Sequence, residues 1–219
     1  MTKPLVVTGY INLNSPYRVD DEYRRLGKLL KDAVPDLHAF EDDMLPDCWL
    51  MKYIPGETID GKPGYTVAMA DNPFKNTVAY HLVQHQKVDW LRQATNIYPD
   101  RDVFVWIDYA VFHMPGVTAA VIQNFLERAA DEEAISIPGC WPPNRDGEPN
   151  WRFCGSVLVA HRKFIPTLDA AIKRVAINRL KRDKRLSFEV NTWADVERSH
   201  TLPIRWYRAD HDASLFTDY

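Results

Sequence analysis

The sequence predicts a single α/β domain in which helices flank a mixed, mainly parallel central sheet. Three observations predict this fold. Residues 103–107, Val-Phe-Val-Trp-Ile, form an unbroken apolar run that is typical of a strand buried on both faces. Residues 5–40 indicate strand, helix and strand in succession, which is the arrangement of a nucleotide-binding half-domain. Segments with helical spacing of apolar residues lie on both sides of the central run, at 76–94 and 118–129.

The chain opens with two predicted strands and the helix between them. Residues 5–13 are β-rich, and Gly9 indicates the point where the first strand opens into a loop. The apolar spacing over 17–31 predicts a helix, which Pro35 ends. Residues 36–40 form a short second strand in this interpretation. Neither a GxGxxG nor a GxxxxGK[ST] motif follows the first strand, which argues against dinucleotide oxidoreductases and P-loop NTPases.

A proline- and glycine-rich loop over 45–73 separates this unit from the clearest predicted helix, 76–94. That helix carries His81 and His85 at the i, i+4 spacing of a two-histidine metal site. The Glu of an HExxH motif is absent, and the spacing places both rings away from the apolar stripe. We therefore expect the two histidines on a solvated helix face.

The second half continues with helix, loop, strand and helix. Thr118 is a predicted cap for a helix up to Ala129, and residues 135–149 have the composition of a loop. Residues 151–160 form the second strongly β stretch. A helix from about Pro166 ends in the basic segment 173–185, whose cations suit the negative end of a helix dipole. That segment indicates either a solvated helix end or a contact with an anionic acceptor or lipid surface.

Composition narrows the functional classes. The formal net charge of −3 gives no general attraction to nucleic acid, so no nucleic-acid partner is expected. The sequence has no apolar run of 18 residues and no signal-like N-terminus. Three cysteines, Cys48, Cys140 and Cys154, are odd in number and lack CxxC spacing, which indicates free thiols in a reducing compartment. We expect a cytoplasmic protein.

Asp108 is the first candidate site residue, because it directly follows the central strand. Ligands of open α/β sheets bind at the carboxyl ends of the strands. A carboxylate at that point is therefore well placed for a site. The structural alternative is that Asp108 caps the strand or starts a turn, for which aspartate is also favoured.

Five motifs, taken in order, resemble those of a small GT-A-type nucleotide-sugar glycosyltransferase. They are Thr8-Gly9-Tyr10 on the first strand, Lys87 on the long helix, Trp-Ile-Asp at 106–108, Phe-Cys-Gly-Ser at 153–156 and Asp-His-Asp at 210–212. The order is most similar to bacterial transferases in which a Trp-Ile-Asp-like motif ends the central strand. The resemblance covers most of the chain. It implies a GT-A-like, Rossmann-like single domain, with a nucleotide-binding part over 1–112 and an acceptor-side part over 113–219.

The resemblance also implies a donor site. In this family the first strand and the loop after it hold the base and ribose, and Tyr10 would offer a stacking surface. The strand at 153–156 would line the side of the donor sugar and acceptor. Positive charge for the leaving diphosphate would come from basic side chains. The implied donor-binding residues are Thr8, Gly9, Tyr10, Lys87, Gly155, Ser156 and Arg205.

A divalent metal, Mn or Mg, is the cofactor that the resemblance implies. Family members hold it with an Asp-X-Asp motif and, in many cases, a late histidine. Asp108 and His211 match these ligands, whereas Ala110 stands where the second aspartate is expected. This departure puts metal dependence in doubt. His211 as an ordinary surface histidine is the structural alternative.

Glu189 is the expected general base of the reaction, with Asp210 or Asp212 behind it. An inverting transferase needs such a base beside the acceptor hydroxyl, and family members place an acidic residue at this point. The structural alternative is that Glu189 only pairs with a neighbouring arginine. For Lys87 the alternative is a side chain that extends over the apolar edge of its helix.

The expected function is transfer of a sugar from a nucleoside diphosphate sugar to a glycan or lipid-linked acceptor. A UDP-sugar is the favoured donor, and residues 173–185 would contact an anionic membrane peripherally. One alternative is a non-catalytic nucleotide- or carbohydrate-binding protein on the same fold, which the loss of the second aspartate favours. Another is a metal-dependent phosphoesterase, for which clustered carboxylates and histidines are too sparse in the sequence.

Overall fold

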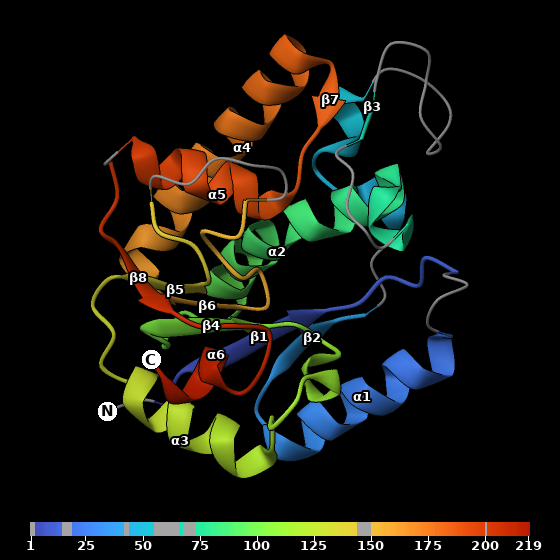
Figure 1. The fold of residues 1–219 in the computed structure, drawn as a ribbon. Helices are drawn as coiled ribbons and strands as arrows, with labels where there is room; N and C mark the ends of the chain where they lie inside the picture. The colour runs from blue at the N-terminus through green and yellow to red at the C-terminus, as the bar shows by residue number, and fades with distance from the viewer. Residues whose placement is uncertain are drawn as a thin grey trace.

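A six-stranded sheet forms the centre of the computed structural model, which describes residues 3–14, 19–41, 44–54, 66–67, 73–143, 150–199 and 201–219 (Figure 1). The strand order is β2-β1-β4-β6-β5-β8. Strand β6 runs antiparallel to both of its neighbours, and the other pairings are parallel. The strands are β1 (Leu5–Gly9), β2 (His38–Phe40), β4 (Val103–Ile107), β5 (Ile135–Gly139), β6 (Val157–His161) and β8 (Ile204–Arg208). The predicted single α/β domain with a mixed, mainly parallel sheet is confirmed.

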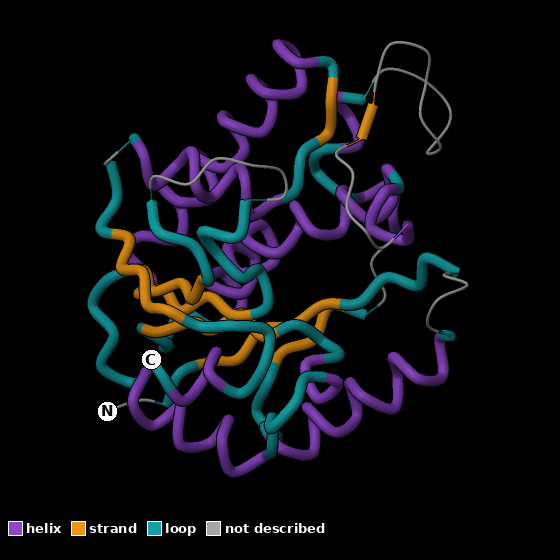
Figure 2. The backbone as a smooth tube through the Cα atoms, viewed as in Figure 1, coloured by secondary structure: helices purple, strands orange, loops and turns teal. Residues whose placement is uncertain are grey.

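Helices cover both faces of this sheet (Figures 1 and 2). One face carries α1 (Asp20–Ala33), α3 (Ala119–Ala129) and the short α6 (Ser214–Thr217). The other carries α2 (Val78–Ile97), α4 (Ile165–Asp183) and α5 (Glu189–Arg198). A small parallel pair, β3 (Thr66–Val67) and β7 (Arg185–Leu186), lies beside α4. Short 3₁₀ turns complete the described elements: η1 (Leu45–Asp47), η2 (Met51–Tyr53), η3 (Pro73–Asn76), η4 (Val111–His113) and η5 (Arg162–Phe164).

Strand β4 shows why its sequence is continuously apolar. Val105 and Ile107 belong to the core beneath α1 and α3, whereas Phe104 and Trp106 belong to the core beneath α2 and α4. Side chains alternate between the two faces of a strand, so a strand covered on both faces needs apolar residues at every position. Burial of each large apolar side chain stabilises the fold by about 1.5–3 kcal/mol.

The predicted helices are confirmed, and two of them begin at a threonine cap, of which Thr118 was predicted from the sequence. The side chain of Thr77 accepts a hydrogen bond from the backbone N–H of Tyr80 at the start of α2. Thr118 does the same for Val121 at the start of α3. These side chains satisfy backbone donors that have no partner within the helix. Within the described residues, no helix combines the length and apolar character that a membrane span requires.

The strand pattern after α3 differs from the prediction. Residues 135–139, predicted as loop, form β5 between β6 and β8. Residues 151–156, predicted as strand, are a turn-rich segment, and β6 begins only at Val157. The segment is hydrogen-bonded to the end of β5, where the Cys154 N–H donates to the Pro138 carbonyl at 2.7 Å. The glycine and proline residues over 135–149 suggested a loop, yet residues 135–139 pair in parallel with β8 and form a strand.

The expectation of solvated histidines on α2 is wrong. His81 is fully buried and His85 is 4% exposed, because α4 and α5 cover the helix face that carries them. His85 donates its Nδ1–H to the His81 carbonyl at 2.9 Å, and its Nε2 lies 3.3 Å from Thr192 Oγ1. Burial lowers the pKa of His85 below its usual 6.5, so the ring is neutral in the folded protein at pH 7.

We therefore expect the fold to lose stability below pH 6.5. The unfolded chain protonates His85 near pH 6.5 while the folded chain does not, so the free energy of unfolding falls as the pH drops toward the lower folded pKa. One such group changes this free energy by at most about 1.4 kcal/mol per pH unit. Urea unfolding between pH 8 and 5.5 measures the slope. A folded His85→Gln variant should show a shallower slope, and an unchanged slope would remove His85 as its source.

Candidate functional site

A cavity of about 330 Å³ opens at the carboxyl ends of β1 and β4. Its walls come from the loop after β1, the middle of α2, the loop after β4 and the first residues of α5. Gly155 and Ser156, just before β6, form part of the floor, and His211 lies at the edge. This is the location expected for a ligand site in an open α/β sheet.

Three charged side chains meet in the cavity. Lys87 Nζ lies 3.1 Å from Asp108 Oδ1 and 3.1 Å from Glu189 Oε1. It also donates to the Gly155 carbonyl at 2.9 Å. The side chains of Lys87 and Glu189 are only 4% and 6% exposed, whereas that of Asp108 is 30% exposed. A buried ammonium thus joins two carboxylates, of which Asp108 is the one more open to the cavity.

Helix α2 sets the position of Lys87 through a close contact with β1. The ring of Trp90, one turn after Lys87, packs where a side chain on Gly9 would be: a Cβ there would lie 2.4 Å from Trp90 Cζ3. Trp90 also stacks on Trp106 of β4, with ring centroids 5.7 Å apart. Gly9 therefore serves the site by letting α2 approach the sheet closely. Tyr80, Gln84 and Lys87 follow one another at helical spacing along the cavity wall.

Backbone pairing fixes Asp108 beside Gly155 and Ser156. The Asp108 N–H donates to the Ser156 carbonyl at 2.9 Å, which extends the β4–β6 ladder by one residue. Trp106 Nε1 donates to Asp108 Oδ1 at 2.8 Å and orients the carboxylate. A Cβ on Gly155 would lie 2.2 Å from Glu189 Oε1. The absence of a side chain at this position makes room for the Glu189 carboxylate.

The charges keep Lys87 protonated. Burial alone would lower the pKa of Lys87, but the carboxylates of Asp108 and Glu189 outweigh burial, and the pKa lies above its usual 10.5. With both carboxylates ionised, the three side chains carry one net negative charge. Such an arrangement can accept hydrogen bonds from hydroxyl groups and can take up a proton.

Tyr10 lies in the cavity wall but is not an open stacking surface. It is 8% exposed, and its ring stacks on Tyr23 and on Tyr109 with centroids 5.2 and 5.0 Å away. Its hydroxyl donates to Asp20 Oδ1 at 2.7 Å. These contacts make Tyr10 a structural support of the wall. Tyr23, which is less buried and also lines the cavity, is better placed to contact a ligand.

His211 stands at the mouth of the cavity with two residues that the sequence interpretation missed. Its ring lies edge-on to Trp151 with centroids 5.5 Å apart, and Lys75 Nζ is 5.6 Å from the Trp151 centroid. Desolvation by its neighbours and the charge of Lys75 lower the pKa of His211 below 6.5, so the ring is neutral at pH 7. Neither Lys75 nor Trp151 belongs to a recognisable motif, so only the fold identifies them.

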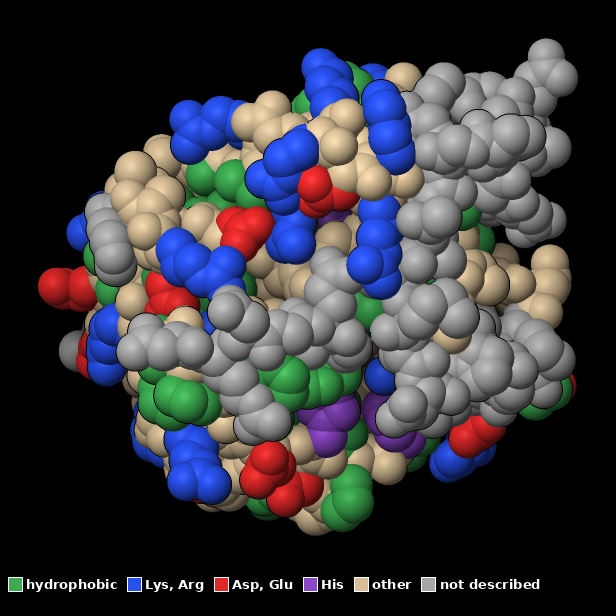
Figure 3. Space-filling view, turned by 45° about the horizontal axis from the view of Figure 1, so that its top comes forward, with side chains coloured by type: hydrophobic (Ala, Val, Ile, Leu, Met, Phe, Trp, Pro, Cys, Tyr) green, Lys and Arg blue, Asp and Glu red, His purple; other side chains and the backbone are tan. Residues whose placement is uncertain are grey.

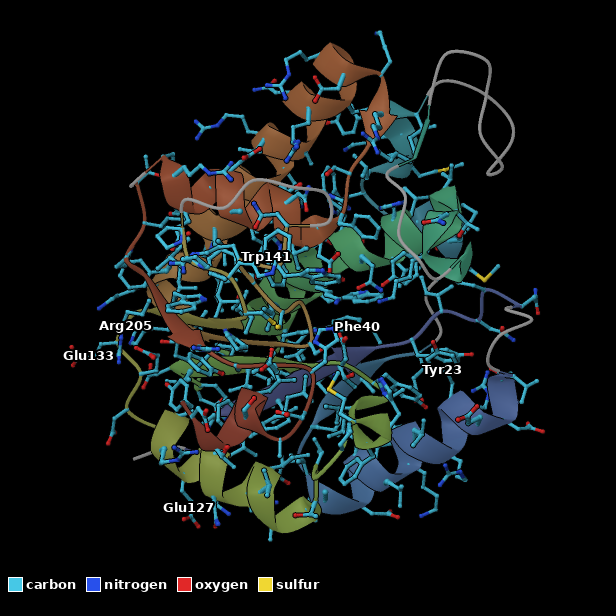
Figure 4. The ribbon with its side chains drawn as sticks, viewed as in Figure 1. Tyr23, Phe40, Glu127, Glu133, Trp141 and Arg205 are labelled. Atoms are coloured by element: carbon cyan, nitrogen blue, oxygen red, sulfur yellow. The ribbon has the colours of Figure 1, made fainter. Side chains whose placement is uncertain are left out.

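Three predicted site residues are not brought to the cavity. Thr8 is completely buried within β1, and the cavity begins at the next residue. Arg205 lies on the edge strand β8, 71% exposed, and pairs with Glu132 at 3.2 Å. Figure 4 shows Arg205 on the side of the molecule opposite Tyr23. Asp210 is exposed and interacts with Cys140 instead of standing behind Glu189. Donor binding by Thr8 or Arg205 and catalysis by Asp210 therefore have no support from their placement.

The residues at the cavity do not fit the divalent metal that the resemblance implies. Among the described residues, no three His, Cys, Asp or Glu side chains come together as metal ligands would. Asp108 Oδ1 already accepts from Trp106 and lies beside the ammonium of Lys87. His211 contacts Trp151 at the cavity mouth. Hard cations such as Mg²⁺ need several oxygen ligands, which this arrangement does not supply.

Three residues of the basic segment 173–185 form ion pairs with acidic side chains. The pairs are Lys173 with Asp169 at 2.9 Å, Arg179 with Asp195 at 2.9 Å and Arg182 with Asp183 at 2.6 Å. In Figure 3, Lys and Arg side chains gather over the upper part of the face shown, with a few Asp and Glu side chains among them. These pairs agree with the interpretation of the segment as a solvated helix end. Contact with an anionic membrane stays a prediction for exposed residues such as Lys181 and Lys184.

All three cysteines are free thiols, as the sequence predicts. Cys140 and Cys154 nevertheless meet, with their Sγ atoms 3.5 Å apart. The contact follows from the pairing of the segment before β6 with the end of β5, which their spacing of 14 residues does not reveal.

Comparison with known proteins gives a likeness at the level of the fold. No family model and no curated protein matches the chain. Among solved structures, the chain is similar to a glycosyltransferase involved in the glycosylation of the major capsid of PBCV-1, with a TM-score of 0.50 and 10% sequence identity. The match covers 95% of this chain and 82% of that one. The chain therefore has a glycosyltransferase-like fold.

Proposed function

We propose that the protein transfers a sugar from a nucleoside diphosphate sugar to a hydroxyl of a glycan or lipid-linked acceptor. The observation that carries this proposal is the pair of carboxylates, Asp108 and Glu189, held by Lys87 in a cavity at the strand ends of a glycosyltransferase-like fold. The cavity volume lies at the lower end of the range typical of small-molecule sites. We place the sugar there.

The lining suits a sugar and a nucleoside. Aromatic side chains offer apolar faces for the sugar ring or the base, and tyrosine hydroxyls offer hydrogen bonds. Burial, and to a lesser extent the charge of Glu189, raises the pKa of Tyr80 well above 10, so its hydroxyl stays a hydrogen-bond donor. We place the base near residues 9–13 and Tyr23, and the phosphates toward Lys75 at the mouth. A UDP-sugar stays the favoured donor.

In this proposal the two carboxylates have different roles. Glu189 acts as the general base: it takes the proton of the acceptor hydroxyl while that oxygen bonds to the anomeric carbon and the bond from that carbon to the diphosphate breaks. Asp108, more exposed, binds sugar hydroxyls through the oxygen that faces the cavity. Lys87 orients both carboxylates. Negative charge on the departing diphosphate is met by Lys75.

Nucleotide binding is the first test. We expect at least one of UDP, GDP, CDP and dTDP to raise the melting temperature. A ligand at 100 times its dissociation constant adds about 2.7 kcal/mol of stability, which corresponds to roughly 5–10 °C for a domain of this size. A thermal-shift screen measures this. Absence of a shift with all four nucleotides would contradict the proposal.

A second measurement separates an enzyme from a non-catalytic binding protein on the same fold. Nucleoside diphosphate release from the matching sugar donor, with a panel of glycan acceptors, reports turnover. The transferase should release nucleoside diphosphate faster with an acceptor present. Tight nucleotide binding without release in any acceptor mixture would favour the binding protein.

A further inference from the structure

We infer that the ammonium of Lys87 is the resident cation of this site, and that the nucleoside diphosphate sugar binds here without a divalent metal ion. The inference rests on the proposed function. It assigns Lys87 a role as a positioning residue that takes the place a bridging metal ion would occupy between the two carboxylates.

The hydrogen bonds of Lys87 occupy all the donors of its ammonium group. An ammonium group has three N–H donors. Lys87 Nζ has three oxygen partners at hydrogen-bond distance: the Gly155 carbonyl at 2.9 Å, Glu189 Oε1 at 3.1 Å and Asp108 Oδ1 at 3.1 Å. All three donors are therefore engaged with the protein, and the side chain is only 4% exposed. Its function is to hold the carboxylates, not to contact phosphate.

Electrostatic repulsion by Lys87 disfavours a metal ion between the two carboxylates. A metal ion bound between Asp108 and Glu189 would have to share the space of the ammonium, and two cations at such short distance repel strongly in a buried site. The two carboxylates raise the pKa of Lys87, so the ammonium does not leave by losing its proton near neutral pH. Ala110, at the position of the second aspartate in the Asp-X-Asp pattern, supplies no further ligand.

The same geometry predicts what removal of the ammonium creates. The three oxygen atoms that surround Nζ come from two carboxylates and one backbone carbonyl, and this is the ligand set that hard cations such as Mn²⁺, Mg²⁺ or Ca²⁺ accept. Lys87→Met keeps an unbranched side chain, makes it one atom shorter so that the position of Nζ is vacated, and removes its charge. We expect this variant to gain a divalent-cation site that the wild-type protein lacks.

The test is an Mn²⁺ titration of the protein without nucleotide, followed by the electron paramagnetic resonance of free Mn²⁺. We expect Lys87→Met to bind one Mn²⁺ at least about tenfold more tightly than the wild type does, since a buried charge of like sign is removed. Lys75→Met is the matched control, because it removes a cavity lysine that does not bridge carboxylates. In this titration without nucleotide, its Mn²⁺ affinity should equal that of the wild type. Equal Mn²⁺ affinity in wild type and Lys87→Met, or no binding by folded Lys87→Met, would overturn the inference.

Nucleotide binding to the wild-type protein tests the same inference without a variant. For whichever of UDP, GDP, CDP and dTDP binds, we expect affinities with EDTA and with Mn²⁺ that agree within about twofold, a difference of roughly 0.4 kcal/mol. Binding that requires Mn²⁺ would overturn the inference and leave the proposed function intact. If none of the nucleotides binds in either condition, the proposed function fails, and the Mn²⁺ titration still decides whether Lys87 occupies a cation position.

Discussion

Glu189→Gln is expected to reduce the rate of sugar transfer by about 10²- to 10⁴-fold, the range that general acid–base catalysis contributes. Glutamine has the size of glutamate and still offers one oxygen to Lys87, 3.1 Å away, but it cannot take up the proton of the acceptor hydroxyl. The measurement is the release of nucleoside diphosphate under saturating donor and acceptor. Nucleotide binding, followed by thermal shift, should change little, because we place the nucleotide away from this carboxylate.

Glu133→Gln is the matched control, because Glu133 is exposed and lies on the far side of the molecule from Tyr23 in the cavity wall (Figure 4). It should transfer sugar at the wild-type rate. The melting temperature of both variants must be compared first, since removing one partner of a buried ion pair destabilises proteins. A folded Glu189→Gln protein with the full rate would remove Glu189 from the chemistry and leave Asp108 as the carboxylate to test.

The sequence predicted those parts of the fold that local patterns determine. Strand β4 is apolar at every position because helices cover both of its faces, and that pattern is visible in five consecutive letters. Helix α3 begins at the predicted cap, Thr118. The placement of Asp108 beside a cavity follows from the same local pattern, because the carboxyl ends of parallel strands meet at one edge of the sheet.

The remaining features depend on contacts between distant parts of the chain. Glu189 and Lys87 are 102 positions apart, so the sequence alone does not show that they meet. For each of them a purely structural role was an equally ordinary interpretation. Arg205 matched the expected charge, but it lies on the edge strand β8, which β6 and β5 separate from β4 and the cavity. It pairs there with Glu132. His85 is buried because α5, which the sequence pattern did not reveal, covers that face of α2.

Gly155→Ala is expected to destabilise the protein and to lower the rate of sugar transfer about as strongly as Glu189→Gln does. The added Cβ would lie 2.2 Å from Glu189 Oε1 and 3.1 Å from Lys87 Nζ. The carboxylate must move, and in doing so it breaks its ion pair in a buried place. Overpacking of this kind costs about 1–3 kcal/mol, or roughly 2–12 °C in melting temperature. Thermal unfolding and nucleoside diphosphate release measure the two effects.

A double-mutant cycle with Glu189→Ala identifies the clash as the cause. If the lost space for the Glu189 carboxylate explains the instability, Gly155→Ala should cost little in a protein that already lacks this carboxylate, and the two changes will not be additive. Additive costs would place the strain of Gly155→Ala elsewhere in the segment before β6. A wild-type transfer rate in Gly155→Ala would show that Glu189 can leave its place beside Lys87 without consequence, which is incompatible with a carboxylate that must be held there to act as the base.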